Sequence, residues 1–162
     1  MKALHTKMEI ILEFCHKSPV HLMFIKGNAK WLGVPELAVK SECPTRWNSF
    51  MICCERFIII VDPLNVTLQE AGKNDLILTP EDMLLMKEIV VELTPFRDLT
   101  VMLSTNTQYS FNEYLPMVDG IKRQLHKPVG KAKSSKTMTD FIKQMRLHFD
   151  TFALQDKVKT LA

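Results

Sequence analysis

The sequence predicts an all-α protein, an irregular helical bundle that forms one domain over residues 1–162. Apolar residues recur at intervals of three and four in most segments, as on one face of a helix. No segment shows a convincing alternation of polar and apolar residues, and no internal repeat is present. The chain is 46% hydrophobic and 24% charged, which is enough apolar material for a packed core.

The first two helices are predicted on either side of Ser18. Residues 3–16 place their apolar side chains on a single stripe: Leu4, Met8, Ile11, Leu12 and Cys15. Ser18 then caps a second helix, and Pro19 suits its first position because proline lacks the amide hydrogen that a helix start leaves unpaired. We expect this helix to pass through Val20 and Phe24 to about Trp31, and we expect Trp31 in the core.

A third helix is predicted from Thr45 or Asn48, either of which can cap it. Apolar residues at helical spacing follow, and such a helix should run through the middle of the core: Phe50, Cys53, Cys54, Phe57, Ile58 and Val61. The β-branched run at 57–61 would also suit a strand. Asp62-Pro63 predicts a break or a kink, and residues 70–75 predict a turn.

Three further helices are predicted in the second half. Thr79 as cap and Pro80 at the first position start a helix with Met86, Ile89, Leu93 and Phe96 on one face, kinked at Pro95. Ser110 and Glu113 form a capping box that opens the next, which ends near His126. A basic linker occupies about 128–136. Thr139 and Asp140 then start the last helix, which carries Phe141, Ile142, Met145 and Phe149.

Composition excludes several classes of protein. No uninterrupted apolar run is longer than that at residues 57–61, which is far shorter than the roughly 20 residues that cross a bilayer, so no membrane partner is expected. The N-terminus lacks the apolar centre of a signal peptide, which favours the cytosol or the nucleus. The four cysteines lack metal-ligand spacing and are expected to be buried free thiols.

No complete active site is visible in the sequence. The five glycines are scattered, so a phosphate loop is absent, and no G-x-S-x-G signature occurs. Cys15, His16 and His21 could in principle gather a metal ion, but Pro19 separates them over two helices, and surface or core roles are expected for the histidines. We therefore expect no catalytic residue, no metal and no cofactor.

Charge is unevenly distributed along the chain. Residues 120–148 contain eight Lys or Arg and one acid, a net charge of +7, whereas the rest of the chain carries −4. Such asymmetry suggests a polyanion as partner. For the linker KPVGKAKSSK, a solvated lysine-rich loop is the better-favoured alternative.

In "CPTRWNSFMICCERFIIIVDPLNVTL", a Pro-Thr-Arg-Trp-Asn-Ser motif leads into the third predicted helix. "EFCHKSPVHLMF" lies upstream of this segment, and "LTPEDMLLMKEIVVELTPFRDLTVMLS" and "YLPMVDGIKRQL" lie downstream. In this order, the four segments resemble the motif-bearing segment and the neighbouring helices of hAT-superfamily transposases and their domesticated relatives with BED-type zinc fingers. The resemblance covers essentially the whole chain, and it favours a helix over a strand at 57–61.

The resemblance implies a place within a larger nuclear protein. In the family, this region is the helical insertion of an RNase H-like catalytic fold, whose metal-binding acids lie before and after the insertion. Two-metal cleavage of DNA needs clustered carboxylates around paired cations. The chain is therefore expected to be a catalytically incomplete fragment, not an enzyme by itself, and to lie in the nucleus.

The same resemblance names the candidate DNA contacts. Arg46 and Trp47 match the family's Arg-Trp pair, which is associated with the transposon end and a displaced base. An aromatic ring can stack on such a base while Arg meets a phosphate. Trp47 as a core anchor with Arg46 as its surface neighbour is an equally weighted alternative. The basic segment adds four candidates: Lys122, Arg123, Lys131 and Lys133.

Two functions thus remain open from the sequence. One is a hAT transposase-like protein without catalysis that contacts DNA ends. The other is a helical scaffold for protein partners in a domesticated, transposase-derived transcription regulator. A protein partner or a homo-oligomer is expected through the rest of the parent protein. An enzyme outside this family is the third alternative.

Overall fold

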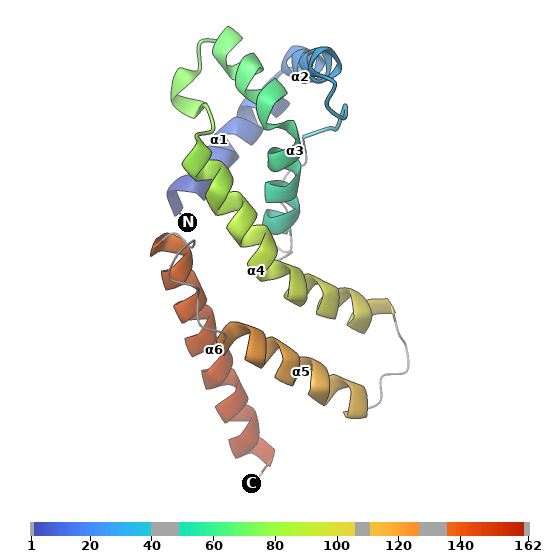
Figure 1. Cartoon of the computed structure of the whole chain (residues 1–162), viewed down its shortest axis with the longest axis vertical. Coiled ribbons are helices and arrows are strands. Elements are labelled where there is room, and N and C mark those ends of the chain that lie inside the picture. Colours follow the sequence, from blue (N-terminus) through green and yellow to red (C-terminus); the bar gives the residue numbers. More distant parts are fainter. Residues whose placement is uncertain (1, 40–48, 106–110, 127–135, 161–162) are drawn as a thin grey trace. The chain divides into compact units, whose positions relative to one another are not determined.

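The computed structural model describes residues 2–39, 49–105, 111–126 and 136–160. Within these ranges the chain is all-α, with six α-helices, one short 3-10 helix and no β-strand (Figure 1). The predicted class, an all-α irregular bundle, is confirmed. The run at 57–61 is helical, so the strand alternative is wrong.

The chain divides into two compact units, Met1–Leu93 and Thr94–Ala162. The first contains α1 (Lys2–Lys17), α2 (Pro19–Leu32), α3 (Ser49–Glu70), η1 (Asn74–Leu76) and the beginning of α4 (Pro80–Thr105). The second contains the remainder of α4, α5 (Phe111–His126) and α6 (Lys136–Thr160). The expectation of one domain over residues 1–162 stays a prediction.

The start of the first unit follows its sequence closely. All five residues of the predicted apolar stripe of α1 are buried. Ser18 caps α2 as predicted, since its hydroxyl oxygen accepts a hydrogen bond from the Val20 amide at 3.3 Å. Gly33 ends α2 in the left-handed conformation, with a φ of 68°, which glycine adopts without steric cost. α2 packs against both α1 and α3.

The prediction that Trp31 belongs to the core is wrong. Its side chain is 81% exposed, whereas Ile25 and Ala29 form the buried face of α2. The rotation of the helix explains this difference. Asn28 Nδ2 donates to the hydroxyl oxygen of Thr67 on α3 at 3.1 Å, and this bond lies on the buried side of α2.

α3 carries more buried side chains than any other described helix of the first unit. Met51, Cys53, Cys54, Phe57, Ile60, Leu64 and Leu68 are all buried on it. The predicted kink is present at Ile60, whose φ and ψ are −103° and 16°, three residues before Pro63. The helix continues beyond the proline to Glu70. The buried Thr67 hydroxyl donates to the Pro63 carbonyl oxygen at 2.8 Å and so meets its hydrogen-bonding need.

A turn follows α3, and the side-chain amide of Asn65 makes two hydrogen bonds to the backbone of Leu78 just before α4. Gly72 has a φ of 69° in the predicted turn after α3. Asn65 on α3 then holds the returning chain, because its Nδ2 donates to the Leu78 carbonyl oxygen at 3.1 Å and its Oδ1 accepts from the Leu78 amide at 2.9 Å. Leu76 and Leu78 are buried beside this contact.

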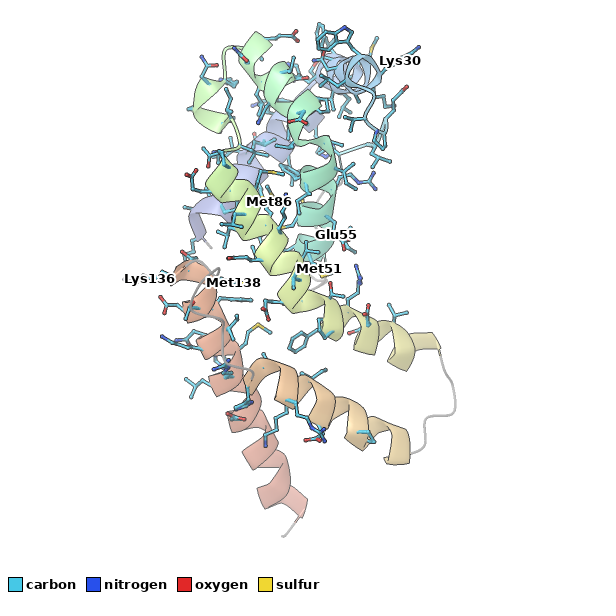
Figure 2. The ribbon with its side chains drawn as sticks, viewed as in Figure 1. Lys30, Met51, Glu55, Met86, Lys136 and Met138 are labelled. Carbon is cyan, nitrogen blue, oxygen red and sulfur yellow. The ribbon has the colours of Figure 1, made fainter. Side chains whose placement is uncertain are left out.

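The first turn of α4 is capped as the sequence predicts. Thr79 and Asp82 bond reciprocally: Asp82 N donates to Thr79 Oγ1 at 3.2 Å, and Thr79 N donates to Asp82 Oδ2 at 3.1 Å. Met86, Ile89 and Leu93 are buried along α4 as expected. Met86 and the buried Met51 of α3 are labelled in Figure 2.

In the second unit, α5 packs against α6. Ile121 and Leu125 are buried on α5, and Met138 and Ile142 are buried on α6. α6 begins at Lys136, three residues before the predicted start at Thr139, so that boundary is wrong. Nothing in residues 136–138 opposes a helix, and a capping residue type marks a favourable start without enforcing one. Ser110, the predicted cap of α5, lies outside the described residues.

Candidate functional site

Basic residues concentrate in the second unit. Residues 94–162 contain eleven Lys or Arg against six Asp or Glu, a net charge of +5. Residues 1–93 contain ten against twelve, a net charge of −2. The division of the chain into two compact units therefore also separates a basic part from a mildly acidic one.

Lys122 and Arg123 lie exposed on α5. Arg123 forms an ion pair with Asp119 one turn earlier, and its Nε donates to Asp119 Oδ2 at 2.9 Å. Both side chains are largely in solvent, 79% and 51% exposed. An exposed pair of this kind is worth only about 0–1 kcal/mol, so a phosphate group can replace the carboxylate at little cost.

Arg146 has a structural role in the second unit. It is half-buried on α6, and its Nε donates to the carbonyl oxygen of Leu125 near the end of α5. His126 makes a second link, since its Nε2 lies 3.3 Å from Asp150 Oδ2. These contacts satisfy a carbonyl that the helix end leaves unpaired and tie α5 to α6.

Four of the six predicted DNA contacts fall outside the described residues: Arg46, Trp47, Lys131 and Lys133. The other two, Lys122 and Arg123, are consecutive residues and are both exposed on α5. The choice between a DNA-contacting and a core position for Trp47 stays open.

In the first unit, the cysteines and histidines described below take part in packing and hydrogen bonding, not in a metal site. Within the described ranges, no three His, Cys, Asp or Glu side chains gather as a metal ion would require. His21 stacks on Phe14 with the ring centroids 3.9 Å apart, and its Nδ1 donates to the Phe14 carbonyl oxygen at 2.9 Å. Cys15, Cys53 and Cys54 are buried and form no disulfide, as predicted, whereas Cys43, the fourth cysteine of that prediction, lies outside the described residues. Burial raises the pKa of the Cys15 thiol to about 11.

A small pocket of about 280 Å³ lies between α1 and the η1 segment. Two acids and two lysines among its lining residues balance its charge. Its lining consists of Ile10, Glu13, Phe14, Lys17, Lys73, Asp75 and Leu76. Glu13 and Lys17 pair with each other at 3.5 Å.

The exposed side of α2 is the feature that sequence reasoning missed. Val20, Met23, Phe24 and Trp31 are 53%, 71%, 52% and 81% exposed. Their spacing of i, i+3, i+4 and i+11 places them on one stripe, and that signal is present in the sequence. Because α2 is apolar on two sides, periodicity alone does not tell which side is buried. The Asn28–Thr67 bond identifies the buried side.

None of the helices in the described ranges combines the length and apolar composition of a bilayer-spanning segment. No protein-family model, curated protein or solved structure matches the chain.

Proposed function

We propose that the chain is a DNA-binding helical region of a hAT transposase-like nuclear protein, the counterpart of that family's helical insertion. The observation that carries this proposal is the +5 charge of residues 94–162 beside the −2 charge of residues 1–93. A basic surface attracts the phosphate backbone and releases its counterions, irrespective of base sequence. The ordered motifs from Cys15-His16 to "YLPMVDGIKRQL" support the choice of family.

The basic unit supplies the phosphate contacts in this proposal. Lys122 and Arg123 offer exposed charge on a helix that Arg146 fixes against α6. Lys131 and Lys133 add two further cations in the segment that follows α5. Such contacts position DNA without reading its sequence.

Arg46 and Trp47 supply recognition of DNA structure. The indole ring stacks on a base that is displaced at a hairpin or branched end, and the guanidinium pairs with a nearby phosphate. Stacking on an aromatic ring stabilises a displaced base by about 1–3 kcal/mol. Cleavage is not assigned to this region, because the resemblance places the family's metal-binding carboxylates outside the helical insertion.

The test is fluorescence anisotropy with a labelled DNA hairpin and a linear duplex of equal length at low salt. The proposal expects tighter binding of the hairpin, and Trp47→Ala should weaken it by about 5-fold to 100-fold. Trp47→Phe keeps an aromatic face and should retain most of the affinity. Circular dichroism checks that both variants keep their helices. If the native chain and Trp47→Ala bind the hairpin with equal affinity, Trp47 does not contact the DNA.

A second candidate function is a helical scaffold for protein partners in a domesticated relative. The exposed apolar side of α2 favours it, because a contiguous apolar patch on a protein surface commonly marks an interaction site. Absence of DNA binding at low salt would favour this second function over the first.

A further inference from the structure

Asp119 is the acid that stands directly before the basic part of the chain. Residues 120–139 contain six Lys or Arg and no acid. Asp119, Lys122, Arg123 and His126 follow one another at helical spacing on α5, and all four are exposed. One carboxylate therefore shares the solvent-facing side of α5 with the two cations that are assigned to phosphate contacts.

The carboxylate of Asp119 holds the guanidinium of Arg123. Nε of Arg123 donates to Asp119 Oδ2 at 2.9 Å, and Nη2 donates to the same oxygen. The spacing of four residues, with the acid nearer the N-terminus, is a geometry in which ion pairs form on a helix surface. Two adjacent N–H groups of the guanidinium are thus occupied, and such groups are the ones that a phosphate accepts from in a bidentate contact.

We propose that Asp119 competes with the DNA backbone for Arg123 and so limits the affinity of the second unit for DNA. In the free chain the carboxylate occupies the guanidinium, and in the complex a phosphodiester group takes its place. This inference rests on the proposed DNA-binding function and adds to it a residue that opposes binding.

The exposure of the pair makes this exchange possible. The side chains of Arg123 and Asp119 are 79% and 51% exposed. An ion pair in this much water is held weakly, because the solvent screens both charges. A phosphate offers one oxygen to each of the two N–H groups, whereas the carboxylate gives both of them a single oxygen. The phosphate is therefore the better partner for this edge of the guanidinium.

The displaced carboxylate stays close to the DNA after the exchange. Asp119 lies one turn from Arg123, on a helix that the contact between Arg146 and Leu125 holds against α6. The carboxylate then faces the bound phosphate, and the two like charges repel each other. The native chain should therefore bind DNA more weakly than a chain with a neutral residue at this position.

Asp119→Asn tests the proposal. Asparagine keeps the shape of the side chain and an acceptor oxygen but carries no charge. Fluorescence anisotropy with a labelled DNA hairpin at low salt should show an affinity about 3-fold to 10-fold higher than that of the native chain. Glu81→Gln is the matched control, because it removes one exposed acid from the first unit, and it should leave the affinity unchanged.

Arg123→Gln separates the exchange from simple repulsion. In an Arg123→Gln background, Asp119→Asn relieves only the repulsion between Asp119 and the DNA. The gain in affinity from Asp119→Asn should therefore be at least about twofold larger in the native background than in this one. Circular dichroism checks that all variants keep their helices.

Three results would overturn the proposal and leave the proposed function intact. They are an affinity that Asp119→Asn does not raise, an equal gain in the Arg123→Gln background, and an equal gain for Glu81→Gln. A native chain that does not bind the hairpin at low salt would overturn both the proposal and the DNA-binding function.

Discussion

Lys7 and Asp82, 75 residues apart in the sequence, form an ion pair in which Lys7 Nζ lies 2.7 Å from Asp82 Oδ2. The same ammonium group donates to the Ile77 carbonyl oxygen at 2.7 Å. Both side chains are about one-fifth exposed. Lys7 therefore joins α1 to the capped start of α4 and to the segment that precedes it.

Substitution of either partner should destabilise the first unit. Asp82→Ala removes the Lys7 contact and half of the capping box, and it should lower the free energy of unfolding by about 1–2 kcal/mol. Lys7→Met keeps the aliphatic stem and should cost about 1 kcal/mol. Urea unfolding followed by circular dichroism measures both changes.

Glu81→Gln is the matched control for these substitutions. Glu81 is an exposed acid in the same first turn of α4. Its loss should cost at most a few tenths of a kcal/mol through the helix dipole. If Asp82→Ala and Glu81→Gln lower the free energy of unfolding equally, the Lys7–Asp82 ion pair contributes nothing to stability.

The Lys7–Asp82 pair also predicts a pH dependence. Partial burial opposes ionisation of Asp82, but hydrogen bonds from Lys7 and Thr79 outweigh it and hold the pKa of this carboxyl below its ordinary value. A carboxyl with a lowered folded-state pKa stabilises the fold above its unfolded pKa of about 4. That contribution is lost as the pH falls from about 4 through the folded-state pKa.

Urea midpoints at a series of pH values between neutral and about pH 3 test this dependence. The native chain should lose more stability below about pH 4 than Asp82→Asn, whose side chain does not titrate. Parallel curves for the two proteins would contradict the assignment.

Phe57 and Trp31 should respond oppositely to truncation, although both are large aromatics on helices of the first unit. Phe57 is fully buried on α3, so Phe57→Ala should cost about 3–5 kcal/mol and unfold much of the unit. Trp31 is 81% exposed, and Trp31→Ala should change the stability of the monomer by less than about 0.5 kcal/mol. Thermal melts of both variants at low protein concentration measure the two changes in stability.

The Cys15 thiol should be inert in the folded chain. Its burial and its pKa of about 11 leave almost no thiolate at neutral pH. In a Cys43→Ser background, Ellman's reagent should label none of the three remaining thiols until urea is added. Prompt labelling of one thiol without urea would place a cysteine at the surface.

The sequence predicted local features that one segment determines by itself. The stripe of α1, the Ser18 cap and the Thr79–Asp82 start of α4 each depend on neighbouring residues, and all are confirmed. The prediction for Trp31 is wrong because its position depends on which side of α2 meets α3. The hydrogen bond from Asn28 of α2 to Thr67, 39 residues away on α3, determines that side.

The same distinction between local features and long-range contacts applies to the candidate site. The basic character of residues 120–148 could be counted from the sequence. The sequence did not reveal that Arg146 holds the end of α5 and that Arg123 pairs with Asp119, because both depend on helix geometry. A count of cations thus includes some that the fold already uses.

The salt dependence of hairpin binding tests the central claim, that the second unit meets DNA through its basic residues. A triple variant, Lys122→Gln with Lys131→Gln and Lys133→Gln, is compared with a control, Lys73→Gln with Lys87→Gln, which removes two exposed lysines of the first unit. If the basic residues of the second unit meet the phosphates, the triple variant should lower the slope of log K against log salt by about 2 to 3, while the control should leave it unchanged. Equal slopes for the native chain and the triple variant would contradict it.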